Sequence, residues 1–123
     1  MTGQPIEKEL DASPLVTTLI EKSMAGKLKW EPTAREGEFI ASVGGDTTLK
    51  ISLTSGEGLD VYGQPETYQV PVLWLVDAKG RSLWEIEQSQ VKGGLWNLYK
   101  LAQRIANKLD EKVAALVEVL QKL

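Results

Sequence analysis

VPVLWLVDAKGRSLWEI, residues 70–86, decides the fold, because it has the pattern of two apolar strands joined by a tight turn. Residues 77–80, Asp-Ala-Lys-Gly, suit a type I turn whose glycine takes the left-handed position of a bulge. In the register that follows from this turn, Asp77 pairs with Arg81. The further pairs predicted are Val76 with Ser82, Trp74 with Trp84, Val72 with Ile86 and, on the reverse face, Leu75 with Leu83.

Apolar residues fall on both faces of this predicted hairpin, whereas a hairpin in a small domain normally has one face in water. We expect helices to cover one face and a protein surface to cover the other, since an exposed apolar strip is unfavourable. A self-complementary strip favours a twofold homodimer, and a different protein would use the same strip heterologously. The alternative is a sheet with helices on both faces. The strip predicted as the interface consists of Val72, Trp74, Val76, Trp84 and Ile86.

Upstream of this hairpin the sequence predicts a second hairpin and a helix. Residues 38–43 and 48–53 alternate in polarity around a Gly-Gly-Asp turn, as strands with one wet face do. Ser13 and Pro14 indicate a helix start, apolar residues follow at helical spacing to Met24, and Gly26 ends the helix. The segment KLKWE, residues 27–31, is either an edge strand or an arm that leads into the sheet.

Two further segments complete the pattern. Residues 54–66, TSGEGLDVYGQPE, are rich in glycine and acid and are predicted to form a long loop, either mobile or functional. From Leu95 to Leu109 apolar residues trace one helical face, and residues 113–120 continue one. Asn107 and Asp110 are poor helix-interior residues, so we expect a kink or break near 107–110 rather than one long helix.

The predicted fold is therefore α+β: an N-terminal helix, a four-stranded antiparallel sheet of two hairpins, and two C-terminal helices or one kinked helix. Residues 1–12 are predicted to be a flexible tail, and residues 13–123 a single α+β domain. A chain of 123 residues is long enough to bury a core without a metal or disulfides.

Composition excludes several classes of function. The chain has no cysteine and no histidine, which removes disulfides, the common zinc sites and the Ser-His-Asp and Cys-His nucleophile systems. No cofactor or metal is expected. A net charge of -3 and a pI near 5.0 do not suit a phosphate backbone, so nucleic acid is not an expected partner. Neither a secretory signal nor a membrane span is recognisable, so we expect no membrane association and a cytoplasmic protein.

Two functional hypotheses remain. The first is a non-enzymatic protein-interaction module, dimeric, that binds itself and another protein through the apolar sheet face, in an adaptor, chaperone-like or immunity-type role. The second is a small-ligand-binding protein or enzyme with a pocket between the sheet and the C-terminal helices. The residues predicted to line that pocket are Asp60, Tyr62, Tyr68 and Tyr99.

Three strings carry a resemblance to known proteins: AGKLKWEPTAREGEFIAS, LVDAKGRSLWEI and GGLWNLYKLAQRIA. They resemble a group of small bacterial α+β proteins that share a helix, a Gly-Lys-Leu-x-Trp segment leading into an antiparallel sheet, an Asp-x-x-Gly turn and a C-terminal helix opening Leu-x-x-Leu-Tyr-x-Leu-Ala. The resemblance spans about residues 15–120 and implies this fold pattern, without a reaction. Trp74 and Trp84 depart from the group's pattern. A looser likeness, to bacterial secretion chaperones that dimerise through a sheet, lacks their helix between strands.

Overall fold

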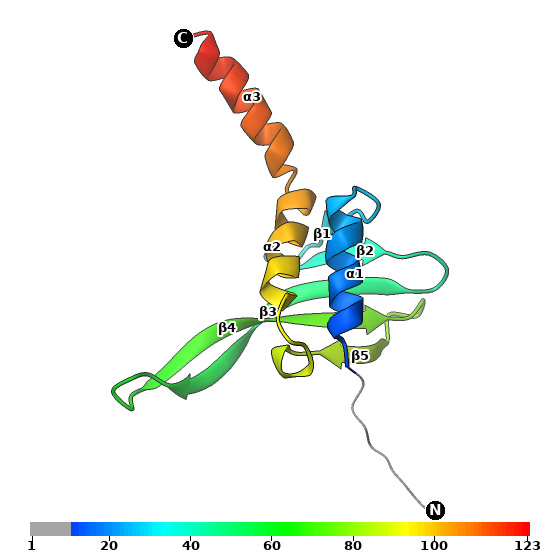
Figure 1. Cartoon of the computed structure of the whole chain (residues 1–123), viewed down its shortest axis with the longest axis vertical. Helices are drawn as coiled ribbons and strands as arrows, with labels where there is room; N and C mark the ends of the chain where they lie inside the picture. Colours follow the sequence, from blue (N-terminus) through cyan, green and yellow to red (C-terminus); the bar gives the residue numbers. More distant parts are fainter. Residues whose placement is uncertain (1–10) are drawn as a thin grey trace, which may run out of the picture.

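A computed structural model describes residues 11–123, and it has an α+β fold with one antiparallel sheet (Figure 1). Residues 1–10, most of the predicted tail, lie outside the described residues. Ala12, at the end of that predicted tail, is fully buried, and its N–H donates to the carbonyl of Gln90 at 3.2 Å. In chain order the elements are α1 (Ser13–Met24), β1 (Glu31–Pro32), β2 (Phe39–Ser42), β3 (Thr48–Leu59), β4 (Pro65–Val76), β5 (Ser82–Ile86), the 3₁₀ turn η1 (Gln88–Gln90), α2 (Leu95–Ala106) and α3 (Leu109–Gln121).

The strands lie in the sheet in chain order, β1-β2-β3-β4-β5, and each pairs with its neighbours antiparallel. Both predicted hairpins are present, as β2–β3 and β4–β5. The sheet has five strands rather than the predicted four, because the segment that leads into it pairs Glu31 with Ile40 and Pro32 with Phe39. A two-residue strand ending in proline belongs at a sheet edge and is too short to show alternation.

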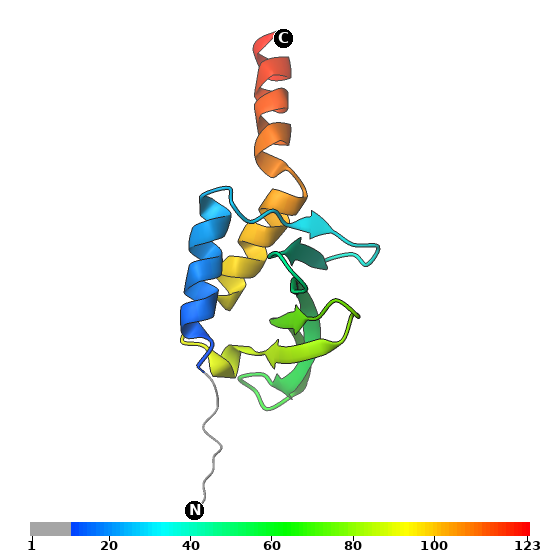
Figure 2. The ribbon, with the colours of Figure 1, turned by 90° about the vertical axis from the view of Figure 1, so that its right-hand side faces the viewer.

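Helices α1 and α2 pack against each other on one face of the sheet (Figure 2). Helix α2 contacts β1, β2, β3 and β4, so it lies across the sheet and closes the core. Within residues 11–123 the opposite face carries no helix, and the alternative of a sheet covered on both faces is therefore wrong. The largest buried side chains of the core include Val16, Leu19, Leu95, Leu98 and Tyr99 from the helices and Phe39, Leu49, Ile51, Leu73 and Ile86 from the sheet.

A buried tryptophan fixes the segment between α1 and β1. The Trp30 side chain is 2% exposed, and its Nε1 donates to the Ser23 hydroxyl at 3.0 Å. A buried indole N–H needs such a partner, and Ser23 is itself buried at the last turn of α1. Leu28 and Trp30 thus both point into the core, as their alternation predicts.

The predicted register of the β4–β5 hairpin holds for Asp77 with Arg81, whose backbone groups are hydrogen-bonded at 2.9 Å, and is wrong beyond Val76. Val76 pairs with Ser82 as predicted, but a bulge then leaves Leu83 unpaired, so that Leu75 pairs with Trp84 and Leu73 with Ile86. A shift of one residue reverses the faces of β5. Its physical reason is burial: the shift places Trp84 and Ile86 on the helix-covered face beside Leu73 and Leu75, and places Glu85 on the other face.

Residues 54–66 are not a loop. They extend β3 to Leu59 and begin β4 at Pro65, so that the two strands project beyond the sheet as a hairpin that we call the arm, residues 54–70 (Figure 1). The turn at its tip is built on Asp60, whose carboxylate accepts the N–H groups of Tyr62 and Gln64 at 2.8 and 2.9 Å. Backbone hydrogen bonds hold this ladder, so it forms without the apolar alternation that the prediction required.

The C-terminal region breaks where the sequence predicts. Helix α2 ends at Ala106, Lys108 takes a left-handed conformation with φ of 53°, and α3 begins at Leu109. The alternative of one long helix is thereby excluded. What the apolar spacing did not predict is the direction of α3, which extends away from the rest of the molecule and has no buried residue.

Candidate functional site

The five residues of the predicted interface do not form one strip. Val72, Trp74 and Val76 lie on the face without helices, whereas Trp84 and Ile86 lie on the helix-covered face. The register shift at the bulge separates them, as described above. Ile86 is fully buried in the core, and Trp84 packs against it.

Two charged side chains of the same sheet face contact Trp74. The ammonium nitrogen of Lys50 lies 4.8 Å from the centre of the ring, within the range of a cation–π contact. The Trp74 Nε1 donates to the Glu85 carboxylate at 3.0 Å. Lys50 and Glu85 lie opposite Trp74 on the two neighbouring strands, so charged side chains stand on both sides of the indole. Trp74 itself is partly buried.

The four predicted ligand-binding residues lie in two separate places. Asp60, Tyr62 and Tyr68 are on the arm, and Tyr99 is buried on α2. The Tyr68 ring covers Gly56 on the neighbouring strand, where an added Cβ would lie 2.5 Å from a ring carbon. Tyr68 and Asp60 therefore have structural roles in the arm, while Tyr62 points into solvent with 85% of its surface exposed.

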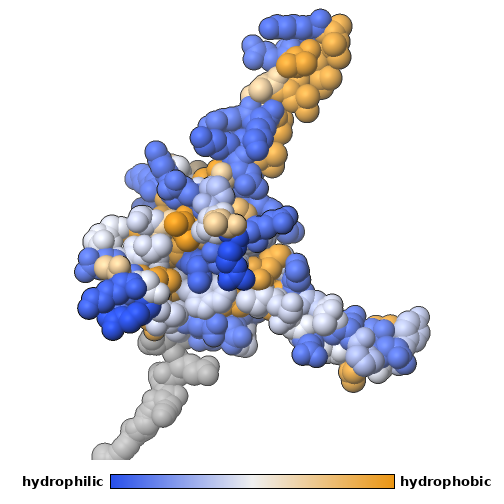
Figure 3. All heavy atoms as spheres, turned by 180° about the vertical axis from the view of Figure 1, so that it is seen from behind, coloured by the Kyte–Doolittle hydropathy of each residue, from blue (hydrophilic) through white to orange (hydrophobic). Residues whose placement is uncertain are grey.

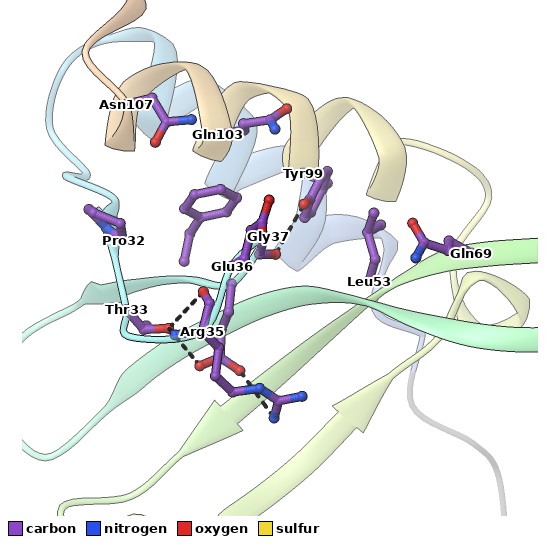
Figure 4. A pocket seen from close by; sticks show the side chains of 12 residues that line it. Pro32, Thr33, Arg35, Glu36, Gly37, Leu53, Gln69, Tyr99, Gln103 and Asn107 are labelled. Atoms are coloured by element: carbon purple, nitrogen blue, oxygen red, sulfur yellow. Dashed lines mark hydrogen bonds and ion pairs between the residues drawn. The ribbon is translucent and has the colours of Figure 1, made fainter.

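A polar pocket of about 610 Å³ lies between α2 and the sheet, in the general position that the second hypothesis predicted (Figure 4). Gln103 and Asn107 extend from α2 over one side of it, and Gln69 comes from the base of the arm. The 33–38 loop forms the other side. The remaining lining residues are Pro32, Thr33, Arg35, Glu36, Gly37, Glu38, Phe39, Leu53 and Tyr99.

Hydrogen bonds fix the wall that the 33–38 loop gives to the pocket. The buried carboxylate of Glu38 accepts the Thr33 hydroxyl at 2.9 Å, and an Arg35 guanidinium nitrogen lies 3.9 Å from its other oxygen. The Tyr99 hydroxyl donates to the carbonyl of Gly37 at 3.0 Å, which ties the loop to α2. Burial raises the pKa of Tyr99, so this hydroxyl remains a donor. Arg35 is the cation at the mouth, and its side chain is largely exposed.

An extended apolar surface lies on α3, where the sequence predicts that residues 113–120 continue an apolar helical face. Its apolar residues gather along one side of the helix, and its charged residues lie on the other (Figure 3). We call this surface the α3 face; it consists of Leu109, Val113, Leu116, Val117, Leu120 and Leu123. All six are exposed. They are exposed because α1 and α2 supply the helical part of the core, which includes no residue of α3.

A second hollow, of about 600 Å³, lies between α1 and α2 next to the start of α3. We call it the α1/α2 groove. Its apolar residues are Ile20, Met24, Leu101 and Ile105, and Met24 is 74% exposed. Its charged and polar residues are Ser23, Asn97, Lys100, Arg104 and Asp110. Arg104 forms an ion pair with Asp110 at 2.7 Å, at the end of the groove where α3 begins.

Comparison of the chain with protein-family models, with curated proteins and with solved structures gives no match. The resemblance to small bacterial α+β proteins thus stays a prediction from the three quoted strings. In the described part of the chain, no helix has both the length and the apolar character that a membrane crossing requires.

Proposed function

We propose that this protein is a non-enzymatic protein-interaction module that docks through the α3 face. The observation that carries the proposal is a complete amphipathic helix of 13 residues with no buried residue. A helix of this length is marginal in water by itself, because most helical stability in proteins comes from packing of an apolar face. The α3 face therefore needs a cover to hold α3 in its helical form.

The α3 face is better suited to docking than the predicted sheet strip. It is continuous along the helix, whereas the strip is divided between two faces and Trp74 already contacts Lys50 and Glu85. Exposed apolar patches of several hundred Å² mark interaction sites on soluble proteins. The α3 face is of this size, since each of its six aliphatic residues is about half exposed or more.

The chemistry of the polar side of α3 favours a protein surface over a lipid surface. Interfacial membrane helices carry lysine and arginine on the polar side and often aromatic residues on the apolar side. Helix α3 instead has three acidic residues, Asp110, Glu111 and Glu118, against one basic residue, Lys112, and has no aromatic residue.

The proposal can be tested in cells by placing a photo-reactive amino acid at position 116, on the α3 face. We expect irradiation to give a discrete adduct between this protein and a protein partner, of whatever identity. The matched control places the same amino acid at position 118, on the polar side of the same helix, and should give none. The absence of an adduct at 116, or the same adducts at both positions, would contradict a docking role for α3.

The polar pocket supports a second candidate function, the binding of a small anionic or amide-containing molecule. Arg35 at its mouth and the carboxamides of Gln69, Gln103 and Asn107 are groups that bind carboxylates and hydrogen-bonding ligands. A screen of small carboxylates and phosphates by thermal shift would test this. A ligand that stabilises the wild type and not the Arg35→Ala variant would support it, and a screen without such a ligand would leave the α3 face as the functional site.

A further inference from the structure

We propose that the α3 face docks into the α1/α2 groove of a second copy of this chain, in a reciprocal exchange that gives a twofold dimer. This inference rests on the proposed function of α3 and names its partner. It joins two surfaces of the molecule that are each apolar and uncovered, the helix face and the groove.

The width of the α3 face fits a groove between two helices. A seam between two paired helices uses only every third and fourth residue, here Leu109, Val113, Leu116, Leu120 and Leu123. Helix α3 adds Val117 and Val119 on the two flanks of this seam, both about half exposed. A face of this width is typical of a helix that packs against two others in a bundle. The groove between α1 and α2 offers two such neighbours.

The groove has the matching chemistry. Its floor is aliphatic and flexible, with Met24, a side chain that adapts to irregular surfaces, among the most exposed apolar residues of the described chain. Lys100 and Arg104 also line it. Arg104 already binds one carboxylate of α3, that of Asp110. The apolar surface of the groove is thus complementary to the α3 face.

The direction of α3 points to a second copy as the occupant. Only Asn107 and Lys108 separate α2 from α3, and they direct α3 away from the groove of its own chain (Figure 1). In a twofold dimer each chain contributes both one helix and one groove, so the buried surface of a single docking event is used twice. Two contacts of several hundred Å² approach the ~800 Å² per partner that stable interfaces bury.

The absence of cysteine in the sequence allows a direct test by cross-linking. Protein carrying Met24→Cys, in the groove, is mixed with protein carrying Leu116→Cys, on the α3 face, and a short bis-maleimide is added. We expect a covalent dimer with one chain of each kind. Light scattering should give twice the 13.6 kDa chain mass for the wild type, and Leu101→Glu in the groove should reduce it to the chain mass, as should Leu116→Glu on α3.

Glu118→Cys, on the polar side of α3, is the matched control and should not link to Met24→Cys. Circular dichroism checks that each variant retains the wild-type fold; Met24, Leu116 and Glu118 are exposed and Leu101 is partly buried. Three results would overturn the exchange: a monomer at every concentration, Leu116→Cys that links to its own copy and not to Met24→Cys, or a Met24→Cys/Leu116→Cys double variant that links within one chain. An adduct at position 116 with a different protein would also overturn it, and would leave the proposed docking role of α3 standing.

Discussion

Helices α2 and α3 follow each other in the chain with the same apolar spacing and have opposite environments. In α2, Leu98 is fully buried, and Leu95, Tyr99 and Ala102 complete a face that closes the core. In α3, Leu116 is 56% exposed, and no residue is buried. An apolar face therefore predicts that a helix will be covered, and it does not say whether the cover belongs to the same chain.

The largest difference should appear in the stability of the single chain. Leu98→Ala leaves a cavity in the core and should lower the free energy of unfolding by about 2–5 kcal/mol. Leu116→Ala should change it by no more than about 0.5 kcal/mol, since this residue has no core contact to lose. Urea denaturation of dilute monomer, followed by tryptophan fluorescence, measures both. Equal losses for the two variants would show that α3 packs on its own chain.

A substitution at Lys108, between α2 and α3, should have a smaller effect and should stabilise the protein. Lys108 is the only residue other than glycine with positive φ in the described chain, at 53°. A left-handed conformation costs a side chain about 1–2 kcal/mol, and glycine avoids most of that cost. We expect Lys108→Gly to raise the free energy of unfolding by about 0.5–1 kcal/mol in the same denaturation assay. Lys108→Ala, which keeps the Cβ, is the control; a loss of stability with glycine would mean that Lys108 does not hold this conformation.

The ion pair between Arg104 of α2 and Asp110 of α3 should contribute less to stability. Arg104 and Asp110 lie 2.7 Å apart but are both largely exposed, and exposed pairs contribute about 0.2–1 kcal/mol. Asp110→Asn should therefore loosen α3 from α2 slightly, with a difference that disappears at high salt. Amide hydrogen exchange of the first turn of α3, at low and high salt, measures this. A difference that persists at high salt would assign the effect to something other than charge.

The smallest effect is expected from removing α3 altogether. A chain that ends at Lys108 keeps every residue of the core and all four tryptophans. Its urea midpoint as a dilute monomer should match that of the full chain, and the near-ultraviolet circular dichroism should be unchanged. A truncated chain that fails to fold would mean that α3 belongs to the core and would remove the contrast between the two helices.

Local patterns in the sequence predict much of this fold. The start of α1, the turn of the β2–β3 hairpin and the break after α2 are all encoded by residues next to them, such as Pro14, Gly44 and Asn107. The arm was missed because residues 54–59 have no apolar alternation, and only backbone pairing with β4 makes them a strand. One signal was present: Asp60-Val61-Tyr62-Gly63 repeats the spacing of Asp77-Ala78-Lys79-Gly80, and both aspartates accept two N–H groups of their turn.

Which side chains are exposed at the candidate sites is decided by contacts between residues far apart in the sequence. The bulge at Leu83 decides whether Trp84 faces the core, and what favours the bulge is burial under helices that lie far away in the sequence. Likewise, the exposure of Leu116 depends on whether α1 and α2 already fill the covered face. Sequence patterns identified these side chains as apolar and spaced for packing, but the surface that each one meets follows only from the assembled layers.

The meander order of the sheet has a consequence for how the chain folds. Each strand pairs with the strand before it in the chain, so most pairings close short loops, and such low contact order favours fast folding. We expect the late step to be the packing of α2 against α1, because all five strands precede α2 in the chain. Helix α3 has no buried residue and takes no part in that step, so the kinetics should separate into a folding phase independent of protein concentration and a slower second-order phase of association.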